Sequence, residues 1–531
     1  MEQFDVIVHC HNIISLDQGL LSLGNTLAVK DQRIAAIGEA SDFTTARAGV
    51  HLDLRNADLF PGFVESHMHL AWTGLIQTQI NCGHPKVKRI ADILNAIRER
   101  AISQPPGTWI LGHHWDDTLL EEQRPPTLQE LSEAAPRHPV YLLHNSGHLA
   151  LANQAAFDCA RIGLQNNIPG IKRTPGGALS GELHEAEALE SISQYIPAPT
   201  TLEMQEAIKA ATAICHSHGV TAATDAAMGL GDPTSVRSIW QAYQHADQTH
   251  ALRVRLACYS RILDQSTFVS ADPPTNFLES RGVKLFADGS IQGHTARLLE
   301  GYHDQPQEHG VLLKSPEELA ALIKFYDQKG QQVIIHGNGD GAIEAILQAY
   351  SQVLSPNNTH RHRIEHAQLA HPDHLKIMKH LGVLPNFFIG HVYYYGDRHR
   401  DRFLGQDRAR QLNPLATALQ LGMPFALHSD SPVTPVNPLA SIETAVTRRT
   451  SMGKFLGEDQ RIPISAAWRA YTDWAAYLGF RETHVGSLRV GAWADFIALN
   501  HNPFETEPDT FWNTVELLHT GVAGEIVYSR T

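Results

Sequence analysis

The chain has 531 residues, of which 43% are hydrophobic and 18% charged, the composition of an ordinary folded protein with more sequence than one compact core uses. Its 56 acidic residues against 42 lysines and arginines give a net charge of -14, which opposes binding to nucleic acid or other polyanions. The five cysteines are scattered and neither a signal peptide nor a membrane-spanning run is recognisable, so we expect a cytoplasmic protein without a disulfide framework or a thiolate zinc site.

The N-terminal segment, residues 1–58, predicts short strands separated by turns at Asp31-Gln32 and Gly38. The expected strands are Asp5 to His9, Leu27 to Lys30, Arg33 to Ile37 and His51 to Leu54. A second β-rich stretch closes the chain over 486–531. Since neither end is long enough to bury a core alone, we expect both to pack into one composite β-sandwich.

Between these ends, apolar strand-like runs alternate with helical stretches, a pattern typical of α/β proteins with a parallel sheet or barrel. Eight such runs predict a (β/α)8 TIM barrel over 59–81 and 200–485. The expected strands are Leu59 to Val64, Gly219 to Thr224, Arg253 to Cys258, Gly282 to Phe286, Gln332 to Ile335, Arg361 to Ile364, Val383 to Asn386 and Pro424 to Leu427.

The first two barrel strands are separated by far more sequence than an ordinary crossover uses. The extra segment, 82–199, contains an amphipathic helix pattern over Ile90 to Ile102 and a stretch rich in proline and glycine from Pro169 to Gly181. We therefore expect an inserted subdomain after barrel strand 1 that roofs the mouth of the barrel.

Two histidines follow the first barrel strand, in Pro61-Gly-Phe-Val-Glu-Ser-His67-Met-His69-Leu. Because alternate residues of a strand share a face, His67 and His69 present two imidazoles to one ion. Taken alone, His-x-His is a weak signal, since exposed histidine pairs are common.

Three more polar residues stand just beyond predicted strands: His336, His366 and Asp430. Enzymes with a TIM-barrel fold have their active sites at the carboxyl ends of the barrel strands. Each residue alone fits a helix cap, a satisfied carbonyl or a turn equally well. Because all three fall at strand ends in a chain that also has His-x-His, the pattern favours a metal centre.

These motifs resemble the amidohydrolase superfamily, in the YtcJ-like branch grouped as amidohydrolase family 3, over nearly the whole chain. The segments that carry the resemblance are 61–70, 283–290, 336–340, 363–368, 429–432 and 486–496. The resemblance implies a metal-dependent hydrolase acting on carbon–nitrogen bonds other than peptide bonds. It also implies one or two divalent ions, usually Zn2+, held by His67, His69, His336, His366 and Asp430, with Lys284 carboxylated and bridging two metals.

Lys284 has two interpretations. A buried ammonium is costly and is repelled by a dication, and conversion to a carbamate reverses its sign. The alternative is a lysine paired with Asp288 or with a substrate carboxylate. We favour the carbamate.

Three residues are predicted to face the substrate: His148, Asp288 and His428. His148 lies in His144-Asn-Ser-Gly-His148, a segment that resembles substrate-bordering segments of relatives, although a loop histidine is more often solvated. Relatives often have glycine where this chain has His428, which either contacts substrate or fills space.

The predicted reaction is hydrolysis of an amide, formamide or cyclic amide in a small molecule, with Asp430 and His336 as the catalytic residues and Asp430 carrying the proton. One alternative is a catalytically silent or regulatory barrel that binds a small ligand. A metal-storage protein is a third reading, but it would gather its histidines in tracts, and these are spread over strand ends. No nucleic-acid or membrane partner is expected, and a homodimer is left open.

Overall fold

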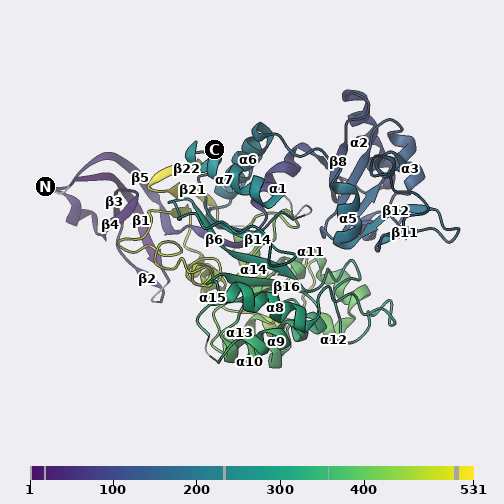
Figure 1. The fold of residues 1–531 in the computed structure, drawn as a ribbon. Coiled ribbons are helices and arrows are strands. Elements are labelled where there is room, and N and C mark those ends of the chain that lie inside the picture. The colour runs from purple at the N-terminus through teal and green to yellow at the C-terminus, as the bar shows by residue number, and fades with distance from the viewer. Residues whose placement is uncertain (1–2, 17–18, 231–234, 357, 507–513, 531) are drawn as a thin grey trace.

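The computed structural model describes residues 3–16, 19–230, 235–356, 358–506 and 514–530, and three sheets organise them (Figure 1). One sheet is a parallel barrel, one is built from both ends of the chain, and one belongs to the segment inserted after the first barrel strand. Among the described helices, none combines the length and the apolar character that crossing a membrane requires.

The barrel sheet has eight strands that follow one another in chain order, and each neighbouring pair is parallel. The strands are β6 (Phe63–Met68), β13 (Val220–Met228), β14 (Arg255–Arg261), β15 (Leu278–Phe286), β16 (Gln332–Gly337), β17 (Arg363–His366), β18 (Leu384–Phe387) and β19 (Ala426–Leu427). The last strand also contacts the first, so the sheet is nearly closed. All residues of β13 are buried, as expected for a parallel strand covered on both faces. The predicted (β/α)8 fold is confirmed.

Helices pack around this sheet and begin and end at local signals. In α8 (Pro316–Asp327), the Ser315 side chain caps the helix by accepting from the backbone N–H of Glu318. In α10 (Pro372–Leu381), the chain leaves the helix at Gly382, whose φ of +70° favours glycine. The other main barrel helices are α7 (Val236–Gln248), α9 (Asp340–Val353), α13 (Leu415–Gln420) and α14 (Pro438–Thr447).

The two ends of the chain form the composite β-sandwich, in a sheet of strand order β22-β21-β20-β5-β1-β3-β4. Its N-terminal strands are β1 (Gln3–Ser15), β3 (Thr26–Lys30), β4 (Arg33–Gly38) and β5 (Arg47–Pro61), and its C-terminal strands are β20 (Phe496–Leu499), β21 (Leu517–Val522) and β22 (Glu525–Ser529). The ends meet where β20 runs antiparallel to the last residues of β5. Val8, Leu27, Leu59 and Phe496 belong to a shared apolar core.

The first barrel strand begins later than the sequence predicts. Leu59 and Pro61 belong to β5 and pair with β20, and the barrel strand starts at Phe63. Gly62 joins the two sheets at a point where an added Cβ would lie 2.2 Å from Thr221 Oγ1. One apolar run therefore serves two sheets, and only a glycine fits the junction.

The inserted segment folds on a sheet of its own, with strand order β11-β12-β10-β9-β8-β7. Its elements are β7 (Ile80–Asn81), α2 (Ile90–Ser103), β8 (Ile110–Trp115), α3 (Leu128–Ala134), β9 (Val140–His144), β10 (Leu149–Ala152), α4 (Gln154–Cys159), β11 (Ile171–Arg173), β12 (Leu179–His184) and α5 (Glu185–Ser193). The amphipathic helix predicted there is α2, whose inner face joins a separate apolar core. Figure 1 shows this unit beside the barrel, on the side away from the terminal sheet.

Candidate metal centre

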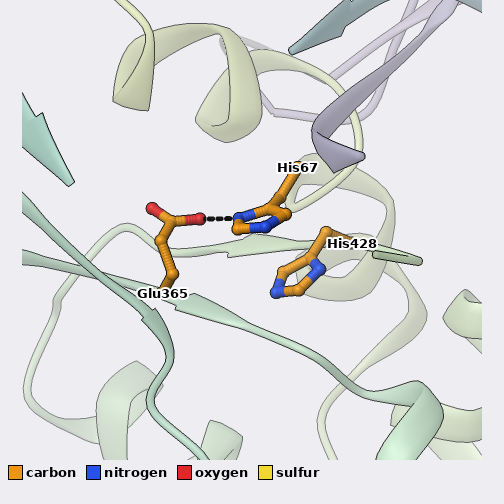
Figure 2. Close-up of side chains that lie close together, drawn as sticks. All are labelled: His67, Glu365 and His428. Carbon is orange, nitrogen blue, oxygen red and sulfur yellow. Dashed lines mark hydrogen bonds and ion pairs between the residues drawn. The ribbon is translucent and has the colours of Figure 1, made fainter. Parts of the chain in front are cut away.

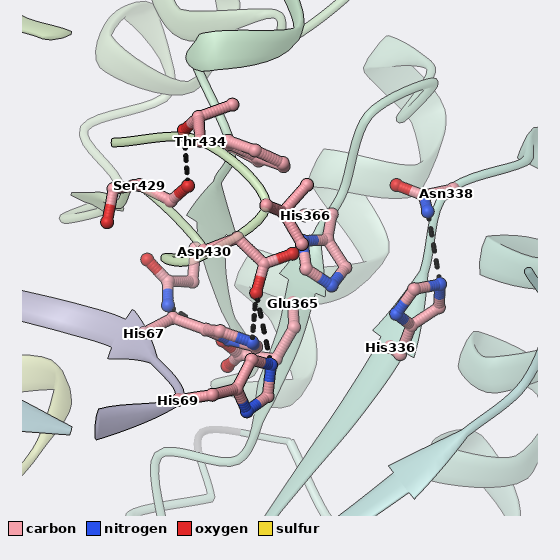
Figure 3. A network of polar contacts seen from close by, with 12 residues as sticks. His67, His69, His336, Asn338, Glu365, His366, Ser429, Asp430 and Thr434 are labelled. Carbon is pink, nitrogen blue, oxygen red and sulfur yellow. Dashed lines mark hydrogen bonds and ion pairs between the residues drawn. The ribbon is translucent and has the colours of Figure 1, made fainter. Parts of the chain in front are cut away.

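The barrel brings four predicted histidines together at the carboxyl ends of its strands (Figure 3). The ring centre of His67 lies 5.6 Å from that of His69 and 5.0 Å from that of His366. The ring centres of His336 and His366 are 4.4 Å apart. All four side chains are buried.

Asp430 closes this cluster from the loop after β19. Its Oδ1 lies 3.3 Å from Nε2 of both His67 and His69, and its Oδ2 lies 3.9 Å from Nδ1 of His366. Burial alone would raise the pKa of Asp430, but the neighbouring imidazoles hold it well below its usual value, so the group is a carboxylate. His67, His69 and Asp430 thus offer two nitrogens and one oxygen within 4.8 Å of one another.

This donor set suits a divalent cation. Nitrogen and carboxylate oxygen are the ligands of catalytic zinc sites. Burial holds the pKa of His336 and His366 well below the usual value, which leaves the neutral rings that bind metals. Asp430 Oδ1 and His366 Nδ1 are buried and have no hydrogen-bond partner among the residues that the structure describes. Such atoms are costly unless a cation or ligand satisfies them.

The backbone at two of these residues is strained. His366 has φ +67° and Asp430 has φ +53°, in the left-handed region that residues with a side chain rarely adopt. Conformations of this kind concentrate at functional sites, because surrounding structure must hold them in place. Here His366 ends β17 and Asp430 lies in the loop after β19, and both side chains reach the cluster (Figure 3).

Lys284, on β15, lies beneath the imidazoles, with its Nζ 3.4 Å from His67 Nε2. The side chain is buried, and burial lowers its pKa to about 8. Within the described part of the chain, no carboxylate forms an ion pair with it, so the pairing with Asp288 considered from the sequence is absent.

Asp288, which the sequence predicts to face the substrate, forms its hydrogen bonds with the protein's own backbone. It is fully buried, and its two oxygens accept from the backbone N–H groups of Arg297, Asn338 and Gly339. Burial raises its pKa to about 7. Asp288 therefore holds the loops after β15 and β16 together, next to His336 Nε2 at 3.6 Å.

His336 stands at the edge of the cluster. Its Nε2 lies 3.0 Å from both the backbone carbonyl oxygen of Gly289 and the side-chain nitrogen Nδ2 of Asn338. The ring of His148, from the inserted segment, packs against it at 5.3 Å. His148 is not a solvated loop residue, because its Nδ1 lies 3.1 Å from Glu185 Oε2 and only 16% of its side chain is exposed.

His428 packs against two rings of the cluster, those of His67 and His366. Its ring stacks on His67 at 4.7 Å and on Phe388 at 5.1 Å, and it has no exposed surface. Neither of its nitrogens has a hydrogen-bond partner among the described residues. Two unsatisfied buried nitrogens are unusual for a residue that only fills space.

Sequence reasoning missed Glu365, a fully buried residue of β17 that contacts His67 Nδ1. Its position in the sequence could have indicated a role, because it is a carboxylate directly before a strand-end histidine, in a strand whose residues are all buried.

Two other groups of histidine and acidic residues have partners that already satisfy them. In the first, Asp327 contacts His360 and His362, but His362 Nδ1 accepts from the backbone N–H of Val333. Its Nε2 therefore carries the hydrogen that it donates to Asp327 and is not free for a metal. In the second, beside Asp117 and His144, Arg398 neutralises Asp116.

Comparisons with known proteins agree with this architecture. The sequence model described as the amidohydrolase family matches residues 51–528. Protein LONG AFTER FAR-RED 3 of Arabidopsis thaliana is 30% identical, with 99% of this chain and 91% of that protein aligned. N-substituted formamide deformylase of Arthrobacter pascens is 27% identical, with 96% of each aligned. An uncharacterized metal-dependent hydrolase from Pyrococcus horikoshii OT3 has the same fold, with a TM-score of 0.76, 23% identity, and 95% of this chain and 99% of that chain covered.

Proposed function

The chain belongs to the amidohydrolase family, and from this membership we propose that it hydrolyses a carbon–nitrogen bond of a small molecule with the help of a bound divalent metal. The observation that carries the proposal is the carboxylate of Asp430, 3.3 Å from the outer nitrogens of both His67 and His69. Two imidazoles and a carboxylate in this arrangement provide ligands and a proton acceptor in one place.

The residues that would hold Zn2+ are His67, His69 and Asp430, with His336, His366 and Lys284 completing a site for one or two ions. A bound Zn2+ would lower the pKa of an attacking water and polarise the carbonyl group of the substrate. The neutral imidazoles fit this role because they donate a lone pair without bringing positive charge.

In the proposed reaction, Asp430 accepts a proton from the attacking water. The water oxygen adds to the carbonyl carbon, the carbon–nitrogen bond breaks, and Asp430 passes the proton to the leaving nitrogen. The products are a carboxylic acid and an amine. His336, held through Nε2 by Gly289 and Asn338, is the second catalytic candidate because its ring faces the same space.

Lys284 is proposed to carry a carbamate. The amine nitrogen adds to carbon dioxide and loses a proton, which turns a cation into an anion. The support is its environment: a buried nitrogen beside His67, with no carboxylate paired to it within the described residues. An anionic group there would suit neighbouring dications.

The substrate is proposed to be a small amide, formamide or cyclic amide that contacts His148 and His428. Formamides are the first class to test, because a relative at 27% identity is named N-substituted formamide deformylase. The unsatisfied nitrogens of His428 support this assignment, since a polar substrate group would pair with them.

The test is a hydrolysis screen of N-substituted formamides, N-acyl amino acids and cyclic amides, read out as released amine or ring-opened acid. The protein is stripped by chelator, divided, and one half is reloaded with Zn2+. The proposal expects turnover of at least one class by the reloaded half alone. Equal turnover by both halves would contradict metal dependence, and metal binding without turnover of any class would favour the ligand-binding barrel.

A further inference from the structure

We infer that Glu365 is a positioning residue, which holds His67 through Nδ1 so that Nε2 of the same ring points to His69 and Asp430. The inference rests on the proposed metal centre and concerns how the chain prepares it. Figure 2 shows the carboxylate of Glu365 directed at the ring of His67, with the ring of His428 next to that of His67.

The contact between Glu365 and His67 is buried, and further polar contacts hold the Glu365 carboxylate in place. The side chains of His67 and Glu365 are no more than 1% exposed. Asn386 donates through Nδ2 to Glu365 Oε2 at 2.8 Å, and the hydroxyl of Ser66 donates to Asn386 Oδ1 at 2.8 Å. Arg363 Nε lies 2.8 Å from Glu365 Oε1. Three strands, β6, β17 and β18, thus fix this one carboxylate.

These contacts decide between two roles for Glu365. One possible metal-ligand atom from each of His67, Glu365 and His428 lies within 4.8 Å of the other two, so these three residues form a second conceivable cation site. However, Oε2 already accepts two hydrogen bonds, and Oε1 faces the positive charge of Arg363. A cation at this point would lie beside the positive charge of Arg363 and would compete with His67 and Asn386 for Oε2. The geometry therefore assigns Glu365 to orientation and not to ligation.

The consequence lies in the tautomer of His67. Because the carboxylate beside Arg363 accepts, Nδ1 of His67 carries the hydrogen and Nε2 keeps its lone pair. That lone pair is on the side of Asp430 Oδ1, at 3.3 Å, and of Lys284 Nζ, at 3.4 Å. Hydrogen bonds of this kind to a ligating histidine are typically worth about 10- to 100-fold in metal affinity.

The test is Glu365→Gln, assayed by Zn2+ competition with a chromophoric chelator and by Zn2+ content at saturation. The amide keeps the shape but cannot offer a carboxylate oxygen to both Arg363 and His67. We expect Zn2+ affinity to fall about 10- to 100-fold while the number of ions bound at saturation stays the same.

The matched control is Glu279→Gln. It breaks another arginine–glutamate ion pair, Glu279 Oε1 to Arg481 Nε at 3.0 Å, which is partly exposed; Glu279 is on barrel strand β15. This variant should lose thermal stability without losing Zn2+ affinity. If Glu365→Gln does not fold, Glu365→Asp retains the charge for Arg363 and withdraws the oxygen from His67, so it should fold and still bind Zn2+ more weakly.

Two results would overturn the inference. Unchanged Zn2+ affinity in a folded Glu365 variant would make the residue a structural ion-pair partner only. Loss of a whole ion at saturation would make it a ligand. Failure of the proposed metal centre is distinguishable, because in that case the unmodified protein would itself bind no Zn2+ with high affinity. Failure of the proposed hydrolysis alone would appear in the turnover screen and would leave this comparison of Zn2+ affinities unchanged.

Discussion

His69 Nε2 lies 3.3 Å from Asp430 Oδ1, although His69 follows the first strand of the barrel and Asp430 follows the last. The two residues meet only because β19 returns to β6 and nearly closes the sheet. The proposed centre is thus a product of barrel closure, and residues distant in sequence share one set of contacts.

Asp430→Asn should remove most turnover and leave the metal largely bound. The amide has the shape of the carboxylate but cannot accept the proton of the attacking water. General acid–base assistance is typically worth about 10² to 10⁴ in rate, so kcat should fall by that order with a smaller change in KM. Steady-state kinetics and metal analysis on the same preparation check this. Near-full kcat with metal in place would make Asp430 a turn residue and leave His336 or His428 as the proton carrier.

His428→Leu should separate substrate contact from space filling. Leucine has a similar size and removes two buried nitrogens that lack partners among the described residues. An unsatisfied buried polar group costs about 1–3 kcal/mol, so the free energy of unfolding of the metal-free protein should stay equal or rise. If a substrate group pairs with His428, kcat/KM should fall about tenfold or more, since a lost hydrogen bond of about 1.5 kcal/mol has that effect. Unchanged kcat/KM would leave His428 as packing.

Lys284 gives a prediction about carbon dioxide. Metal-free protein reloaded with Zn2+ in degassed buffer should recover activity more slowly than protein reloaded with bicarbonate, because the carbamate must form first. Lys284→Ala should lose activity and regain part of it with added formate or acetate, small carboxylates that fit the vacated space. Recovery rates that do not respond to bicarbonate would favour an unmodified lysine.

Asp116→Asn should weaken the attachment of the inserted segment. Asp116 pairs with Arg398 at the end of α11 (Gly390–Arg398), on the barrel. Burial alone would raise the pKa of Asp116, but Arg398 and His144 outweigh it and lower the pKa from 3.8 to about 2. A carboxyl group whose pKa is lower in the folded protein than in the unfolded chain stabilises the fold at any pH above the unfolded-state pKa. Here the contribution is roughly 2 kcal/mol, and it disappears as the pH falls from about 4 toward about 2.

Urea unfolding of wild type and Asp116→Asn at pH 7 and near pH 3 measures this difference. The gap in free energy of unfolding should be present at pH 7 and narrow in acid. Asp53→Asn is the control, because Asp53 pairs with Arg55 on the open surface and should change stability little. A gap that does not depend on pH would mean that the loss comes from packing and not from charge.

The sequence predicted the barrel well because most of its strands are buried and contain short apolar runs that alternate with helical stretches. Each expected barrel strand overlaps an observed one, and the family resemblance is confirmed. The expected strand Leu59 to Val64 overlaps β6 only in its last two residues, because one apolar run crosses from β5 into β6 at Gly62. Apolar character alone does not say which sheet a strand joins, since that depends on the C-terminal partner β20.

The clustering of His67 and His69 was predictable because strand periodicity is local. The sequence alone could not tell which of Asp288 and Asp430 joins the histidine cluster, since both are acidic residues just beyond a strand. Asp288 is occupied by backbone N–H groups such as that of Asn338, 50 positions further along the chain. Glu365 was missed for a related reason: its role depends on Asn386 and His67, which lie on other strands.

The central claim is tested most directly by the Zn2+ content of folded wild-type, His69→Ala and His216→Ala proteins after dialysis against the same Zn2+ buffer. His216 is also buried, but its Nε2 contacts the carbonyl oxygen of Arg253 away from the cluster, so it is a matched control. The account predicts one or two ions per chain in wild type and His216→Ala, and a clear loss in His69→Ala together with loss of hydrolysis. Equal Zn2+ content in all three proteins would contradict it.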